Sequence, residues 1–234
     1  MQNKLAISLA AGAMTLLLVS PTLLADADIS KVNGTIRVES GRQVGSVETV
    51  NGSIRIGDSV RARNVETVSG SIEIGEDSSV GEIDTVNGSV TLSRNTKADS
   101  IEAVNGRVRM HDKAEVREHV TNTNGSITLG RGARIGGRIE NVNGKIELDG
   151  ASVGGGIKTT NGDIEIGAGS RVDGGIHVQK VNQVGLFATS RKPRITIGPD
   201  AIVNGTLQFD REVELRISDR ATVGKIVGAQ PIRD

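Results

Sequence analysis

The sequence predicts an all-β fold, a single-stranded parallel β-helix (solenoid) of about ten coils of 18–19 residues. One observation is a short unit, typified by residues 50–57 (VNGSIRIG), that recurs through most of the chain. Its starts are 18, 18, 18, 18, 19, 19 and 18 residues apart, and a fixed period of this size indicates stacked units. Another is composition: 31 glycines, two phenylalanines and no tryptophan or tyrosine suit a narrow core of Val, Ile and Leu.

Within each unit, apolar residues fall at fixed positions when the Asn that begins it is numbered zero. They alternate at +3 and +5, as in a β-strand, and recur at +11, +14 and +17. In the unit that starts at Asn51, these positions hold Ile54, Ile56, Ala62, Val65 and Val68. We expect all five positions to face the core, on three short faces per coil. A meander of hairpins, which Asn-Gly turns also allow, should instead repeat as paired arms of similar length.

The chain divides into a leader, two runs of repeats with a loop between them, and a tail. Residues 1–27 are interpreted as a signal peptide, because Lys4 precedes an apolar run and Ala25 and Ala27 fit the cleavage rule. The alternative is an uncleaved anchor. We expect β-helix repeats over 28–178, a protruding loop over 179–192, C-terminal β-helix coils over 193–228 and a tail over 229–234. The last unit is expected to begin at Asp210, and Pro231 to end strand pairing.

Charge and composition exclude several classes of function. The 28 Lys and Arg balance 28 Asp and Glu, so the chain lacks the basic footprint of a nucleic-acid-binding protein. The absence of cysteine excludes disulfides, thiolate metal sites and cysteine nucleophiles. The three histidines occupy different positions in their units, and no cluster of acids and bases stands out. We therefore expect no enzyme, no catalytic residue, no cofactor and no metal centre.

Seven asparagines share the zero position and form the most regular feature of the chain. They are Asn33, Asn51, Asn87, Asn105, Asn124, Asn143 and Asn161. Stacked at strand spacing, their amides can hydrogen-bond from coil to coil. We interpret the column as a structural turn ladder, and a ligand-binding groove is the functional alternative.

Four carboxylates share position +15: Glu48, Glu66, Asp84 and Glu102. A column of like charges about 5 Å apart repels itself. Several oxygen ligands in a row could hold Ca²⁺ weakly, although the chain lacks the nine-residue repeat of calcium-binding β-rolls. We favour a solvated charged face, with a weak cation stripe as the alternative.

The later units carry a family likeness. Residues 127–139, 164–176 and 195–205, each built on an Ile-x-Ile/Leu-Gly sequence followed by a small-residue turn, resemble bactofilins, which are polymer-forming bacterial cytoskeletal proteins. The earlier Val-Asn-Gly-Ser-Ile units are similar to exported adhesin-type β-helix proteins. The resemblance covers nearly all of the mature chain and implies a right-handed, non-enzymatic β-helix. The signal peptide departs from bactofilins, which are cytoplasmic.

These observations favour a non-catalytic exported scaffold or self-associating structural protein of the cell envelope, periplasmic or secreted. An adhesin-like module for an envelope polymer or protein is the alternative, and a carbohydrate-active or acyl-transfer enzyme is a third. Coil one begins soon after the cleavage site, which leaves no room for a cap. Because open strand edges invite pairing with another chain, we expect self-association through the N-terminal coil and no membrane span after cleavage.

Overall fold

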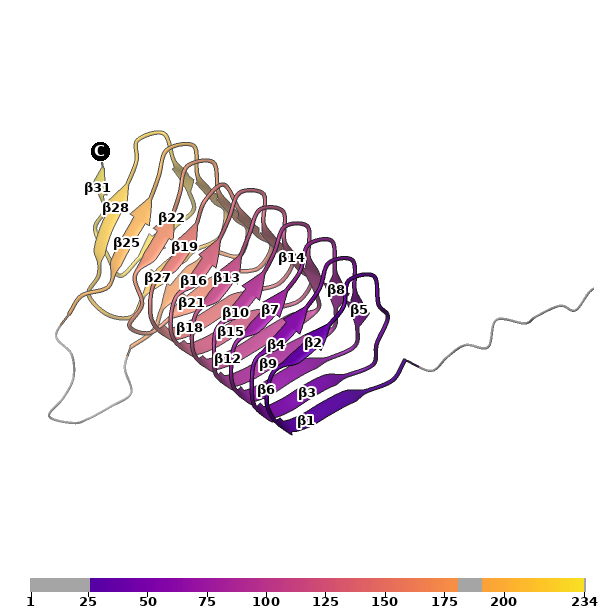
Figure 1. Ribbon diagram of the computed structural model, residues 1–234. Helices are drawn as coiled ribbons and strands as arrows, with labels where there is room; N and C mark the ends of the chain where they lie inside the picture. Colours follow the sequence, from indigo (N-terminus) through magenta and orange to yellow (C-terminus); the bar gives the residue numbers. More distant parts are fainter. Residues whose placement is uncertain (1–25, 181–190, 234) are drawn as a thin grey trace, which may run out of the picture.

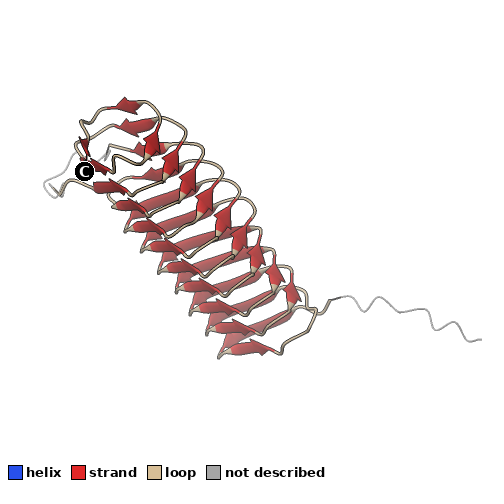
Figure 2. Cartoon of the chain, turned by 90° about the horizontal axis from the view of Figure 1, so that it is seen from above, coloured by secondary structure: helices blue, strands red, loops and turns tan. Residues whose placement is uncertain are grey.

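A computed structural model describes residues 26–180 and 191–233, which form one rod of three parallel β-sheets (Figure 1). Each turn of the chain between the two terminal turns adds a strand to each sheet, and the turns stack along the rod (Figure 2). Two sheets have eleven strands and one has nine, so the rod has about eleven turns. The predicted solenoid is confirmed. Nearly all of the predicted signal peptide and most of the predicted 179–192 loop lie outside the described residues.

We label the sheets A, B and C. Sheet A contains β1 (Ile29–Asn33), β3 (Val47–Asn51), β6 (Val65–Ser69), β9 (Glu82–Asn87), β12 (Ser100–Asn105), β15 (Val120–Asn124), β18 (Ile139–Asn143), β21 (Ile157–Thr159), β24 (Ile176–Val178), β27 (Leu207–Phe209) and β30 (Ile226–Val227). Sheet B contains β2 (Ile36–Val38), β4 (Ile54–Ile56), β7 (Ile72–Ile74), β10 (Val90–Leu92), β13 (Val108–Met110), β16 (Ile127–Leu129), β19 (Ile146–Leu148), β22 (Ile164–Ile166), β25 (Arg194–Ile197), β28 (Glu214–Ile217) and β31 (Ile232–Arg233). Sheet C contains β5 (Arg61–Ala62), β8 (Ser79–Val80), β11 (Lys97–Ala98), β14 (Glu115–Val116), β17 (Arg134–Ile135), β20 (Ser152–Val153), β23 (Arg171–Val172), β26 (Ile202–Val203) and β29 (Thr222–Val223).

The sequence repeat is also the register of the sheets. Val47 pairs with Val65 in sheet A, and Ile54 pairs with Ile72 in sheet B, each one repeat further along the chain. Equivalent residues therefore stack in straight columns, about 4.8 Å apart. Repeat position alone decides which face a side chain occupies and which side chains lie above and below it.

The described ranges contain no helix with the length and apolar character needed to span a membrane.

The core contains the predicted positions +3, +5, +11 and +14. In the third turn these are the buried side chains of Ile72, Ile74, Val80 and Ile83. Two further positions, +9 and +16, also point inward and carry small or polar residues, such as Ser78 and Thr85. Ser78 is tolerated inside because its hydroxyl donates to the carbonyl of Gly57, at 2.9 Å.

The predicted core position +17 was wrong for the valines of the early turns, although Phe209, at the same predicted position near the other end, is buried. Val68 keeps 45% of its surface exposed, and the valines at the same position in neighbouring turns are similar. The sheet A strand continues from +14 to the end of the repeat, so its two-residue alternation turns +14 and +16 inward and +15 and +17 outward. Thr67, at +16, occupies the place in the core that we had assigned to valine.

The first turn begins with β1 at Ile29, within the repeats expected over 28–178, and the C-terminal end differs from expectation. There, Ile195 pairs with Leu215, 20 residues on, so the last unit begins at Glu212 and not at Asp210. The prediction that the tail is unpaired was also wrong, because β31 pairs with β28. Pro231 immediately precedes β31, where its missing N–H removes no bond of the strand.

Candidate functional site

The predicted acidic column lies on the outer face of sheet A. Glu48, Glu66, Asp84 and Glu102 come from β3, β6, β9 and β12, and each pairs in register with the next. We call these four residues the acidic column. The same strands turn position +17 outward as well, two residues further along.

A line of exposed valines runs beside the acidic column. We call it the valine ridge, and it consists of Val32, Val50, Val68, Val86 and Val104. The two lines together border a groove of about 740 Å³ that follows the rod axis through the first turns and ends at Thr121 and Thr123. Sequence reasoning found the column and missed the ridge, because it placed these valines in the core.

The acidic column places four carboxylates in register, and their charge is largely uncompensated. On sheet B, Glu73 lies 3.1 Å from Arg55, and Glu165 lies 2.6 Å from Lys145. In the acidic column, among the described residues, the one ion-pair contact joins Glu102 to Nε2 of His119, at 3.3 Å. The repeat can place cations opposite carboxylates, as sheet B shows, but it does not do so among these four carboxylates.

Burial and the neighbouring like charges both affect the pKa of Asp84. Partial burial, followed by the neighbouring charges of Glu66, Glu102 and Glu82, raises the pKa of Asp84 to about 6. Its charged form is therefore disfavoured in the folded chain. No group of three or more His, Asp or Glu side chains in the described part of the chain is arranged to hold one metal ion, so the geometry gives the cation stripe no support.

We predict that Asp84→Asn stabilises the protein at pH 7.5 by about 1 kcal/mol, or 2–4 °C in Tm; the figure is discounted because the side chain is partly solvated. A raised carboxyl pKa destabilises the fold above about pH 6, and this cost disappears as the pH falls toward 4. The advantage of the variant should therefore vanish at pH 4 in thermal melts.

The matched control for Asp84→Asn is Glu140→Gln. Glu140 occupies the equivalent position of sheet A three turns further along the rod. Burial raises the pKa of Glu140, but hydrogen bonds and charge from Arg138 and Lys158 outweigh it and hold the pKa below its ordinary value. This control should lose a little stability at pH 7.5. Equal losses of stability in the two variants would show that the charge on Asp84 does not destabilise the fold.

The asparagine column forms side-chain hydrogen bonds between turns. Nδ2 of Asn124 donates to Oδ1 of Asn105 at 2.9 Å, and Asn143 donates to Asn124 at the same distance. The last amide, Asn161, accepts from Nη1 of Arg211 at 2.7 Å. This geometry favours the structural interpretation. The terminating arginine could not be found from the sequence, because it lies in the two extra residues that lengthen the unit before the last.

The ladder is interrupted where Ser69 replaces asparagine between Asn51 and Asn87. We predict that Ser69→Asn bridges the gap and stabilises the rod by about 0.5–1 kcal/mol, the net value of a hydrogen bond. Thermal melts of Ser69→Asn and of the control Ser69→Ala test this. An asparagine variant no more stable than the alanine variant would argue against a stabilising ladder.

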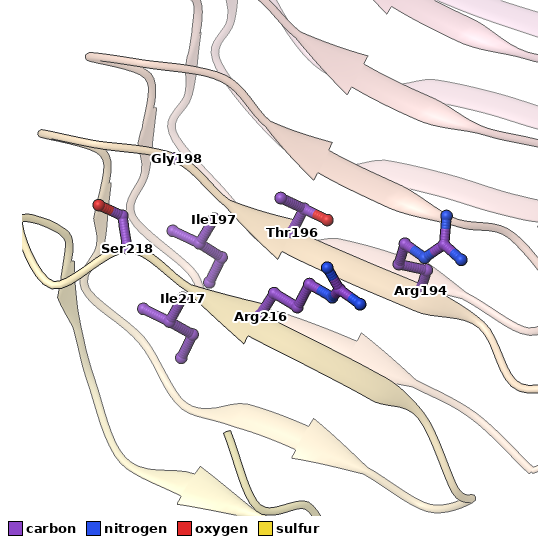
Figure 3. Close-up of a pocket in the computed structure, with 7 residues that line it drawn as sticks. All are labelled: Arg194, Thr196, Ile197, Gly198, Arg216, Ile217 and Ser218. Atoms are coloured by element: carbon purple, nitrogen blue, oxygen red, sulfur yellow. The ribbon is translucent and has the colours of Figure 1, made fainter. Parts of the chain in front are cut away.

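Two other polar sites lie toward the C-terminal end. His177 is 2.6 Å from Asp210 through Nε2, and neither it nor His119 bonds a hydroxyl group among the described residues. A shallow pocket of about 440 Å³ on sheet B lies beside Arg194 and Arg216, which come from neighbouring strands (Figure 3). Both arginines pair with Glu214, so one carboxylate offsets part of the charge of the two guanidinium groups.

Comparison with known proteins gives no match: no protein-family model, no curated protein and no solved structure matches this chain. Function is therefore inferred from the rod and its surfaces.

Proposed function

We propose that this chain is a non-catalytic β-helix scaffold of the cell envelope, exported and cleaved near residue 27, and that it binds its partner through the outer face of sheet A. The observation that carries the proposal is the groove between the acidic column and the valine ridge. Uncompensated like charges reduce stability, and exposed apolar side chains reduce solubility. Such features are typical of surfaces that a partner covers.

The form of the groove supports binding more than catalysis. It lies on the outside of a regular sheet, where each turn repeats the chemistry of the previous one. No hydrogen bond among the described groove residues joins a hydroxyl group to a carboxylate or a histidine that would activate it. Repetition at a fixed spacing instead suits the recognition of an elongated partner.

The test compares three immobilised forms of the mature chain, starting at residue 28, in envelope extract from the source cell. One is wild type, one has the acidic column changed to glutamine, and one carries four matched glutamines on sheet B. The sheet B changes are at Glu73, Glu147, Glu165 and Glu214. We expect the bound material to be lost in the column variant and kept in the sheet B variant. Identical bound material from all three forms would refute sheet A as the binding face.

A second role, self-association through the N-terminal end, is supported by the open edges of β1 and β2. Each is the terminal strand of its sheet. The N–H of Ile36 donates to Ser53, so the next amide, that of Arg37, points away from β4 and is available to another chain.

Size-exclusion light scattering of the mature chain over a range of concentrations tests this role. We expect a dimer that Arg37→Pro weakens, because proline removes an edge donor without removing a bond within the rod. A wild type that is monomeric at every concentration would contradict it.

A further inference from the structure

We infer that the partner of the sheet A groove is a cationic amphipathic α-helix that lies along the rod, with basic side chains on the acidic column and an apolar stripe on the valine ridge. This inference rests on the proposed function and names the chemistry of its partner. It depends on three features of the groove: its charge, its apolar wall and its repeat distance.

The charge of the groove requires a positively charged occupant. Glu48, Glu66 and Asp84 have no ion-pair partner among the described residues, and Glu102 contacts only His119. A second copy of this chain fits poorly. In later turns the same column provides Lys158, which lies 3.7 Å from Glu140, and His177, which is paired with Asp210. Apart from Lys31 at the N-terminal end, whose Nζ donates to the carbonyl of Thr35, the cations that a second copy would offer from this face are already paired.

The valine ridge requires an apolar stripe beside the cations. Val50, Val68, Val86 and Val104 each leave 40–45% of their surface exposed, in successive turns. A partner made only of cations, such as a simple polyamine, would leave this wall in contact with water. An occupant with both chemistries, on adjacent lines, covers the whole groove.

The repeat distance distinguishes a helix from an extended chain. Four carboxylates in neighbouring strands span three intervals of about 4.8 Å, or roughly 14 Å. Three turns of an α-helix rise about 16 Å, a difference that flexible lysine side chains absorb. An extended strand offers one side chain to the same face every 6.8 Å or so, and three such intervals span about 20 Å. A helix parallel to the rod therefore stays in step with the column, and a strand does not.

A fluorescent 18-residue peptide provides the probe, with leucines along one helical stripe and lysines along the adjacent flank. Anisotropy titration of the mature chain should show saturable binding that weakens as salt is raised. The double variants Glu66→Gln/Glu102→Gln and Val68→Thr/Val86→Thr should each weaken binding about tenfold, equivalent to about 1.4 kcal/mol. Threonine is a conservative choice, because Thr123 naturally occupies this position in the sixth turn.

The controls are matched within the same two columns. Val142→Thr and Glu140→Gln change the equivalent positions in the seventh turn, beyond the groove, and should leave affinity within about twofold. A second peptide of identical composition, with leucine and lysine alternating as in a strand, should bind more weakly.

Several outcomes would overturn the inference. One is equal or tighter binding of the alternating peptide. Another is a groove variant that binds like wild type. A third is failure of both peptides together with self-association that the groove variants abolish, which would identify a second copy as the occupant. If neither peptide binds but capture from envelope extract still requires the acidic column, the helix is wrong and the proposed function stands. Capture that ignores the column would refute the proposed function itself.

Discussion

Replacing Ile74 with aspartate is expected to prevent the third turn from packing and to cost more than about 4 kcal/mol, because it buries an unpaired charge in an apolar stack. Ile74 is 1% exposed and lies between Ile56 and Leu92 in neighbouring turns. Turns of a solenoid are stabilised by their neighbours, so the first turns should separate from the rest of the rod. Soluble yield and thermal melts by circular dichroism measure the effect.

The control is the adjacent residue. Glu73 points to solvent and pairs with Arg55 at an exposed site, so Glu73→Ala should cost less than about 1 kcal/mol. Comparable losses in the two variants would mean that the inward and outward faces of sheet B are misassigned.

Replacing Gly125 with alanine is expected to have the second largest effect, about 3 kcal/mol or more. Gly125 has a φ of +143°, and a Cβ there would lie 1.7 Å from the carbonyl oxygen of Gly106 in the previous turn. The clash is with backbone that is itself stacked, so it cannot be relieved by moving a side chain. The Tm of Gly125→Ala, measured against wild type, tests the prediction.

Gly169→Ala separates this clash from backbone strain alone. Gly169 also has a positive φ, of +67°, but nothing lies within 4 Å of its Cβ position. Its substitution should cost only about 1 kcal/mol. If Gly169→Ala proves as damaging as Gly125→Ala, close stacking of the turns is not what requires glycine at the Asn-Gly corner.

Much of the fold could be predicted because an 18-residue period and strand alternation leave little freedom. Ile72, Ile74 and Ile83 were assigned inward from spacing alone, and their burial confirms the assignment. The prediction for position +17 failed because positions +5, +11 and +17 are six residues apart, which suggested three equal inward faces. The sheet A strands instead continue through +17 and turn it outward. A buried threonine such as Thr67 gives no apolar signal in the sequence.

The candidate site was only half predictable for the same reason. The acidic column is plain in the sequence, and its mutual repulsion could be expected from the spacing. The valine ridge could not be found once its members had been placed in the core. The raised pKa of Asp84 also depends on partial burial, which only the packing of the turns reveals. Arg211 was missed because it lies at the end of the repeat before the last, which is two residues longer than the 18 expected.

The most direct test of the account is a comparison of photo-cross-linking positions in the source cell. A photoreactive amino acid replaces one of three residues. These are Val86 in the groove, Val142 at the equivalent position of sheet A beyond the groove, and Glu115 on sheet C. We expect one main adduct in the envelope fraction from position 86, and little from positions 142 and 115. Adducts of equal yield at all three positions, or adducts only from sheet C, would contradict it.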